Sequence, residues 1–356
     1  MTTTRTATTR LLFAAGAAAW LAACNPEPQV PAERAADGAS RAPAAGAPSA
    51  APAAQPRSGS ADAPNAPAGG SASGLPARIV AKRGGFIPEG VEYDEKNRRF
   101  LTGSLAEGTI FRIDADGSVV PFVMDPELVS SVGIEVDEAR DRLLVCNSDR
   151  AVFDGKSAGQ AKLGIYNLTS GERIAMVDLT ASMRRKPENA AFFANDVTVD
   201  DDGNVYVTDT RQNAVYKVGS DQKPAILYRF EPAEGLALNG IVYAEGGYLI
   251  VIGGPKLYKV TTGDPAKLTE VKLDAPIPGA DGMVFLPDGR LAVVSNSQSK
   301  VFALESDDGW DSASMTATAP FEGQATTAAV AGADVYVVQP HFNDQEPPVI
   351  ERVSFR

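Results

Sequence analysis

The chain has 356 residues, a net charge of −12 at pH 7, two cysteines and one histidine. Its negative charge disfavours nucleic acid and acidic ligands, because phosphate is bound chiefly by Lys and Arg. Two cysteines cannot form a disulfide-rich scaffold, and the sequence contains no G-x-S-x-G elbow, phosphate-binding loop or G-x-G-x-x-G turn. These exclusions leave other classes of globular enzyme and binding modules.

Residues 1–23 have the pattern of a secretory signal. Arg5 and Arg10 precede a short apolar run, and Leu21-Ala22-Ala23 stands directly before Cys24. A basic start followed by a short apolar core and small residues predicts cleavage rather than a membrane span. The cysteine resembles the bacterial lipoprotein processing motif, which implies that Cys24 is lipidated. An ordinary signal peptide with an incidental cysteine is the alternative.

Residues 24–75 are mostly Ala, Pro, Gly and Ser with almost no large apolar side chain. Such a segment cannot bury enough surface to offset the entropy lost on ordering, so we expect a disordered tether. Together the two segments predict an exported protein on the periplasmic face of the bacterial cell envelope. We expect it to contact the membrane through its lipid alone and to be a monomer.

The remaining residues, 76–356, repeat one unit that is clearest at 192–210. There, Val197-Thr198-Val199 and Val205-Tyr206-Val207 flank an Asp/Gly/Asn turn, which predicts a β-hairpin. Each copy opens with a pair of residues, and the second member of the pair falls at positions 90, 133, 196, 240, 282 and 327. Several short strands in each unit of about 40–45 residues are typical of propeller blades. The one longer step, from 133 to 196, is accounted for by insertions near 153–162 and 184–189.

The sequence therefore predicts an all-β fold, a six-bladed β-propeller. The last copy ends at Arg356 without an outer strand, whereas Ile79 lies in an apolar segment that precedes the first copy. We expect this N-terminal strand to pair with the last blade and close the ring.

Opening strands of propeller blades line the central channel, so the pairs ahead of them should meet at one end of it. Those pairs supply two carboxylates and two amides: Glu89, Asn195, Asn239 and Asp281. Such hard oxygen ligands suit one divalent cation such as Ca²⁺, Mg²⁺ or Mn²⁺, with Zn²⁺ a further candidate. Each residue taken alone could instead be an ordinary turn former.

The same four pairs, in this order on six repeats, resemble the regucalcin/gluconolactonase family of six-bladed propellers. That resemblance covers Ile79 to Phe355 and implies that Glu89, Asn239 and Asp281 bind one divalent metal, with Asn195 bordering metal and substrate. It also implies hydrolysis of lactones, with Asp281 as the proposed base. Strictosidine-synthase-like and paraoxonase-like propellers share the general layout.

One position departs from the family pattern. Sugar lactonases of the family carry an arginine two residues before the third-blade asparagine, and here that position is Phe193. An aromatic ring cannot replace the planar fork of donors of a guanidinium, so a less hydroxylated lactone or ester is expected as substrate. The loops after the second strands offer further rim candidates, each of which could equally be a solvated loop residue: Asn147, Asp209, Asn296 and His341.

The activity that follows is divalent-metal-dependent hydrolysis of a small lactone or ester, with Asp281 as the catalytic residue and Asn195, Phe193 and His341 in contact with substrate. Propellers also serve as binding platforms, so a non-catalytic ligand- or protein-binding module with a structural cation is the competing hypothesis.

Overall fold

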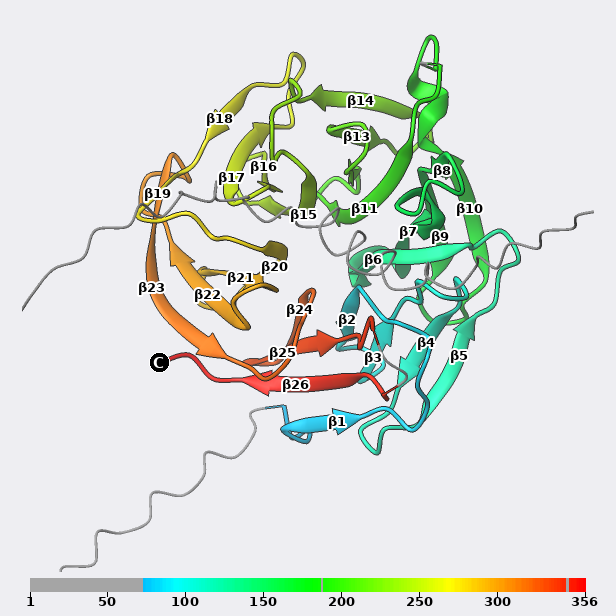
Figure 1. Ribbon diagram of the computed structural model, residues 1–356, viewed down its shortest axis with the longest axis vertical. Coiled ribbons are helices and arrows are strands. Elements are labelled where there is room, and N and C mark those ends of the chain that lie inside the picture. Colours follow the sequence, from blue (N-terminus) through cyan, green and yellow to red (C-terminus); the bar gives the residue numbers. More distant parts are fainter. Residues whose placement is uncertain (1–72, 187, 344–345) are drawn as a thin grey trace, which may run out of the picture. The chain divides into compact units, whose positions relative to one another are not determined.

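The structure is a computed structural model, and it describes residues 73–186, 188–343 and 346–356. The predicted signal and nearly all of the predicted tether, including Cys24, lie outside the described residues. Strands make up 49% of the structure and helices 4%. Six sheets surround a central axis (Figure 1), so the prediction of a six-bladed propeller is confirmed.

In each of the first three blades the chain runs from the channel outward. Blade 1 comprises β2 (Val91–Asp94), β3 (Arg99–Thr102), β4 (Ile110–Ile113) and β5 (Val119–Val123). Blade 2 comprises β6 (Ser130–Asp137), β7 (Arg142–Ser148), β9 (Lys162–Asn167) and β10 (Arg173–Asp178). Blade 3 comprises β11 (Phe192–Val199), β12 (Val205–Asp209), β13 (Ala214–Val218) and β14 (Pro224–Arg229), with β8 (Gly159–Gln160) beside β11. Three short 3₁₀ helices accompany these blades: η1 (Glu138–Arg140), η2 (Arg150–Val152) and η3 (Leu179–Ser182).

The last three blades follow the same plan. Blade 4 comprises β15 (Leu238–Ala244), β16 (Tyr248–Gly253), β17 (Lys256–Thr261) and β18 (Leu268–Glu270). Blade 5 comprises β20 (Ala280–Phe285), β21 (Leu291–Ser295), β22 (Lys300–Glu305) and β23 (Ser312–Pro320), with β19 (Lys272–Leu273) at its outer edge. Blade 6 comprises β24 (Ala328–Ala331), β25 (Asp334–Gln339) and β26 (Val349–Val353), completed by β1 (Arg78–Val80).

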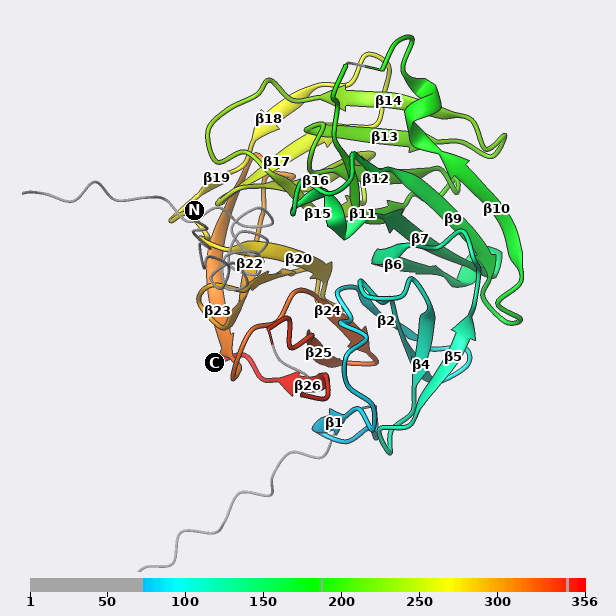
Figure 2. The same cartoon turned by 45° about the vertical axis from the view of Figure 1, so that its right-hand side comes forward.

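The N-terminal strand closes the ring as the sequence predicts. β1 pairs antiparallel with β26, with Ile79 opposite Ile350, and the two strands run side by side in both views (Figures 1 and 2). This pairing covers the outer edge of β26, which would otherwise expose unpaired backbone groups.

The core lies between neighbouring blades because alternate residues of each strand point to opposite faces of its sheet. Along β16, Ile250 and Ile252 pack toward blade 5, whereas Leu249 and Val251 pack toward blade 3. Within the described residues, each interface between adjacent blades contains one such apolar cluster. Each blade therefore packs against two clusters, and moving it would disturb both. This packing on both sides fixes the positions of the inner strands around the channel.

The insertion predicted near 153–162 is more ordered than a loop. It contains β8, which pairs parallel with β11 through Gly159 opposite Phe192. The segment thus reaches from blade 2 onto blade 3 and covers the N-terminal end of β11. In the part of the chain that the structure describes, no helix combines the length and apolar character needed to cross a membrane.

Candidate functional site

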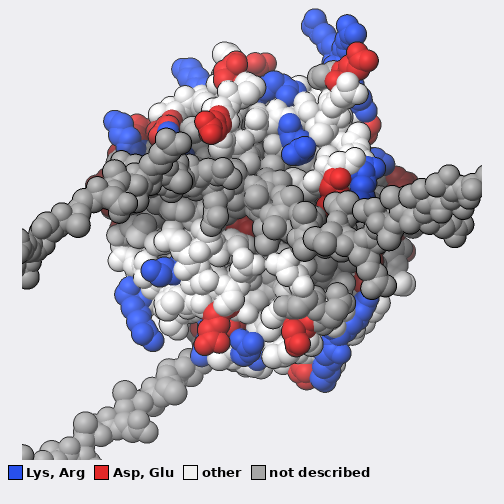
Figure 3. Space-filling view, viewed as in Figure 1, with Lys and Arg blue, Asp and Glu red and all other residues white. Residues whose placement is uncertain are grey.

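A polar cavity of about 220 Å³ lies on the propeller axis, between the inner strands. Four carboxylates line it: Glu89, Glu92, Glu135 and Asp196. None of the described residues that line it is Lys, Arg or His. Around the circumference, by contrast, basic and acidic side chains lie next to one another (Figure 3). The cavity therefore concentrates carboxyl groups without a compensating protein cation.

The opening pairs lie within irregular strand segments, a position that the sequence did not reveal. The register between β11 and β12 shifts between Ala194 and Val197, so Asn195-Asp196 forms a bulge. The same shift occurs at Asn239-Gly240 and at Asp281-Gly282. A bulge releases a strand from its neighbour's ladder and redirects a side chain, a device often found beside active sites. Here it turns Asn195 and Asn239 toward the cavity.

Glycine follows two of these polar residues because adjacent inner strands approach closely there. A Cβ atom at Gly240 would lie 2.6 Å from the carbonyl oxygen of Asp281. Glycine removes this clash, so the segment bearing Asn239 can lie against the segment bearing Asp281. The side-chain Nδ2 of Asn239 then donates a hydrogen bond of 2.8 Å to Oδ1 of Asp281.

The four predicted ligands come together at this place. Glu89, Asn195 and Asn239 line the cavity, and Asp281 is joined to Asn239 by the bond just described. No described residue donates a hydrogen bond to the Glu89 carboxylate, and its pKa lies well above its usual range because of burial, then Asp281, then Asp196. Burial likewise raises the pKa of Asp281 to about 7, against the lowering effect of the Asn239 bond. Bringing Glu89 and Asp281 together thus opposes ionisation of both.

Comparisons with known proteins identify the family of the chain. The SMP-30/gluconolactonase/LRE-like family matches residues 87–309, well over half of the chain. The chain belongs to this family. The comparison with curated proteins found no match.

Solved structures similar to the chain share its fold. The major allergen Mala s 1 of Malassezia sympodialis is 19% identical with a TM-score of 0.67, and the match covers 79% of this chain and 96% of that one. A gluconolactonase from Xanthomonas campestris is 15% identical with a TM-score of 0.55, covering 78% and 89%. A luciferin-regenerating enzyme is 13% identical with a TM-score of 0.55, covering 78% and 94%. At these identities the likeness shows the fold alone.

Within the described residues, no group of three or more His, Cys, Asp or Glu side chains is arranged to hold a metal ion. The predicted ligand set of this SMP-30/gluconolactonase/LRE-like chain consists of two carboxylates and two amides. The absence of such a group within the described residues therefore neither supports nor contradicts this ligand set, and the metal stays a prediction.

Three cavity carboxylates were missed by the sequence interpretation. Glu92 and Glu135 occupy ordinary positions of alternating strands, so nothing local distinguishes them from solvent-facing residues. Asp196 did carry a signal, because it stands where the equivalent repeats of this family member have Gly90, Gly133, Gly240 and Gly282. Its Oδ2 accepts a hydrogen bond of 3.1 Å from the backbone of Ile241 and so links blades 3 and 4.

Phe193, at the position where the family's sugar lactonases carry arginine, does not line the cavity. It is only 1% exposed, because the half-buried ring of Phe153 packs edge-on against it with centroids 4.7 Å apart. The guanidinium of Arg211 lies 5.5 Å from the centroid of Phe153. Contact between Phe193 and a substrate stays a prediction, and in this structure Phe153 covers it.

Of the rim candidates, Asn296 is the one joined to the site, through an Nδ2 atom 3.5 Å from Oδ2 of Asp281. Asn147 and Asp209 are fully buried and bound to the backbone. Asn147 accepts a hydrogen bond from the backbone N–H of Val129 and donates one to the carbonyl oxygen of Glu127. Asp209 accepts hydrogen bonds from the backbone N–H groups of Phe193, Arg211 and Gln212. His341 is half-buried in the connection between β25 and β26, has a left-handed backbone with φ of 55°, and does not line the cavity.

Proposed function

We propose that this propeller is a divalent-cation-dependent hydrolase of small lactones or esters. The supporting observation is the convergence of Glu89, Asn195, Asn239 and Asp281 at an acidic cavity that no described Lys, Arg or His lines. Membership of a family that includes gluconolactonases favours the same reaction class. An acidic, uncompensated set of oxygen atoms is what a hard divalent cation requires.

The residues fit such a cation. The amide oxygen of Asn195 receives no hydrogen bond from any described residue, although the side chain is only 2% exposed. Asn195 lines the cavity, so this oxygen is available to a cation or a substrate there. A cation held by Glu89, Asn195, Asn239 and Asp281 would polarise the substrate carbonyl and stabilise the developing oxyanion.

Asp281 is the proposed base. Without a cation, burial raises its pKa to about 7, and a bound divalent cation would lower that pKa. In the cation-bound protein Asp281 would therefore be an ionised carboxylate that can accept a proton from water at neutral pH. As the water oxygen bonds to the carbonyl carbon, that proton moves to Asp281. When the carbon–oxygen bond of the ester or lactone breaks, Asp281 returns the proton to the leaving oxygen. Asn239 and Asn296 orient the carboxylate through its two oxygens.

The rim beside Asn195 supports a weakly hydroxylated substrate. Phe153 covers Phe193 and presents an aromatic ring with the guanidinium of Arg211 over it. Such an aromatic surface suits an apolar substrate group. Phe153→Ala should raise KM for aryl esters more than for short aliphatic lactones, and Phe193→Arg should shift preference toward polyhydroxylated lactones.

The direct test is calorimetry of the Cys24→Ser protein with Ca²⁺, Mg²⁺, Mn²⁺ and Zn²⁺, followed by a hydrolysis screen of lactones and aryl esters with and without EDTA. We expect binding of one cation per chain and EDTA-sensitive hydrolysis. Cation binding without hydrolysis would favour the non-catalytic binding module instead. Absence of both would refute the proposal.

We further propose that Cys24 carries the lipid that anchors the exported protein to the cell envelope. The proposal rests on the sequence pattern of residues 1–24. Cys24→Ser should move the protein from the membrane fraction to the soluble fraction. A variant that still sediments with membranes would place the anchor elsewhere.

A further inference from the structure

Thr210, directly after β12, makes two side-chain hydrogen bonds with blades 3 and 4. Its Oγ1 lies 2.7 Å from the carbonyl oxygen of Leu238 and 2.9 Å from Nδ2 of Asn195. A hydroxyl has a single proton, and a carbonyl oxygen can only accept. The proton of Thr210 therefore points to Leu238, and the bond to Asn195 must be donated by the amide.

This polarity determines which way the Asn195 amide faces. Its nitrogen is directed to Thr210, so its oxygen is directed away, toward the cavity that Asn195 lines. A flipped amide would set its oxygen against the oxygen of Thr210 and point two N–H donors at the cavity. Thr210 is only 7% exposed and Asn195 only 2%, so bulk water cannot readily replace the lost bond.

The same hydroxyl also holds the next blade. Leu238 directly precedes Asn239, whose side chain reaches Asp281 across the interface between blades 4 and 5. Through one Oγ1 atom, Thr210 thus ties the Asn195 side chain to the backbone that carries Asn239. Spacing between two predicted oxygen ligands from different blades depends on this link.

We propose that Thr210 is the positioning residue that keeps the amide oxygen of Asn195 facing the candidate cation and substrate. The inference rests on the proposed hydrolase function and adds a specific residue to it. Residues that orient ligands commonly change metal affinity or activity by about 10–100-fold when they are replaced.

The test replaces Thr210 in the full chain by valine, which keeps the shape and removes the hydroxyl, and by serine, which keeps the hydroxyl. Thr210→Val should weaken Ca²⁺ affinity and lower kcat by roughly 10-fold or more, and Thr210→Ser should recover most of both. Thr180→Val is the control. Thr180 is also buried, at 4% exposure, and its hydroxyl donates to the Asp178 carboxylate, but it neither lines the cavity nor contacts an amide side chain.

A double-mutant cycle separates positioning from mere stability. In Asn195→Ala no amide remains for Thr210 to orient. Adding Thr210→Val to that background should then change Ca²⁺ affinity little, whereas a purely structural role gives the same loss in both backgrounds. This comparison also serves if Thr210→Val alone is poorly stable, because the melting temperature is measured for all four proteins.

Two negative outcomes are distinguishable. If the wild-type protein neither binds Ca²⁺, Mg²⁺, Mn²⁺ or Zn²⁺ nor hydrolyses any lactone or ester, the proposed function fails and this inference fails with it. If the wild type is active while Thr210→Val matches it, or if the losses in the cycle are additive, the role of Thr210 is overturned and the hydrolase proposal stands.

Discussion

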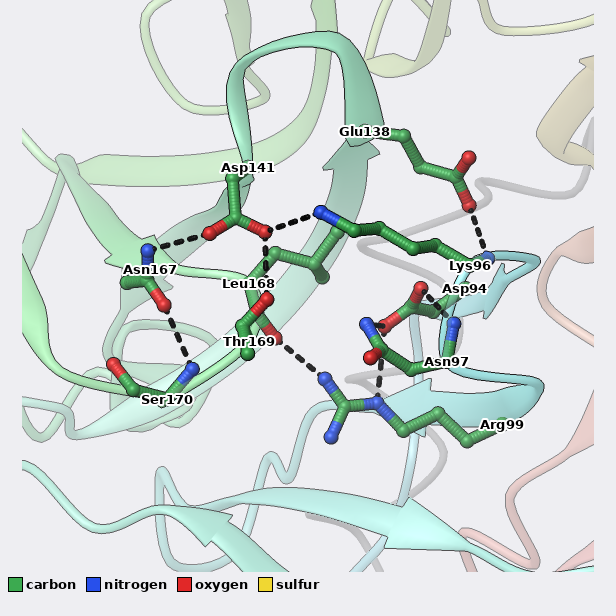
Figure 4. Close-up of polar contacts among 10 residues, drawn as sticks. All are labelled: Asp94, Lys96, Asn97, Arg99, Glu138, Asp141, Asn167, Leu168, Thr169 and Ser170. Atoms are coloured by element: carbon green, nitrogen blue, oxygen red, sulfur yellow. Dashed lines mark hydrogen bonds and ion pairs between the residues drawn. The ribbon is translucent and has the colours of Figure 1, made fainter.

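Two sets of carboxylates lie in the inner strands of blades 1 and 2, and their surroundings differ completely. At the turn end of β2, Asp94 binds Nε of Arg99 at 3.0 Å and the side chain of Asn97 (Figure 4). At the corresponding end of β6, Asp137 binds Arg142 at 2.6 Å and Arg140 at 3.2 Å. Both carboxylates are thus compensated by arginines, one of which follows five residues later in each repeat.

The carboxylates two residues earlier in the same two strands have no arginine partners among the described residues. Glu92 and Glu135 line the cavity, and no described residue forms an ion pair with either. The pKa of Glu92 lies well above its usual range because of burial, then Glu135, then Asp196. Burial and Asp196 raise the pKa of Glu135 to about 8. Hence the partner, rather than burial alone, distinguishes a carboxylate that stabilises a blade from one that is available to a ligand.

The largest expected effect comes from neutralising a channel carboxylate at the candidate site. Asp281→Asn removes both a charged ligand and the proposed base, so we expect hydrolysis to fall by about 10²–10⁴-fold and cation affinity to fall with it. Steady-state kinetics and calorimetry measure these losses. Asp94→Asn is the control, because it alters a paired carboxylate away from the cavity and should keep the cation affinity. Equal cation affinity in wild type and Asp281→Asn would contradict the assignment.

Removing a compensated carboxylate should damage stability instead. Asp137→Ala leaves Arg142 and Arg140 without their shared acceptor while Arg142 remains only 17% exposed. Breaking a buried pair from one side costs about 3–5 kcal/mol, and we expect a loss near the lower limit because Arg142 retains the carbonyl of Gly203. Urea denaturation of wild type and Asp137→Ala measures this loss in the free energy of unfolding. Undiminished stability would show that the arginines find other partners.

The difference between the two sets also shows how far sequence alone can lead. Repeats at nearly regular spacing predicted the blades, the closing strand and the convergence of the opening pairs. The 2.8 Å contact between Asn239 and Asp281 brings two of these pairs together. The metal at that place stays a prediction. Local patterns do encode inter-blade packing, because each strand has to present apolar residues on both faces.

Contacts made by insertions and by polar strand residues could not be predicted in this way. Phe153 covers Phe193 from 40 residues away in the chain, through a segment that no other repeat contains. Glu92 and Glu135 follow the alternation of any half-exposed strand, and only the closed ring makes them neighbours. Asp196 in place of a repeat glycine was a visible signal, and its significance became clear only once the inner strands were seen in contact.

The carboxylates without arginine partners should make the free energy of unfolding of the wild-type protein depend on pH. Below the unfolded pKa, near 4.5, Glu135 is protonated in both the folded and the unfolded states, and its raised folded pKa contributes its full stability there. Between about 4.5 and 8 the folded state binds more protons than the unfolded state, so the free energy of unfolding should fall as pH rises. Asp196, with a pKa raised to about 7, acts in the same direction. Thermal melts in EDTA from pH 5 to pH 8.5 test this, and a melting temperature that rises with pH would contradict it.

The smallest and most specific effect should come from Glu135→Gln. Glutamine has nearly the same shape and cannot ionise, so it removes one half-buried charge that Asp196 and Glu92 disfavour. At pH 8 in EDTA we expect a gain of about 1–3 kcal/mol in the free energy of unfolding, and at pH 5 no difference from wild type, because the wild-type side chain is then protonated.

Cation affinity should stay within a few-fold, since Glu135 is not among the four proposed ligands. Glu127→Gln, an exposed carboxylate bound to Arg173, is the control and should show no gain at either pH. If Glu135→Gln were destabilising at pH 8, the ionised carboxylate would have to have a partner in the channel, and the contrast between the paired and unpaired sets would not hold.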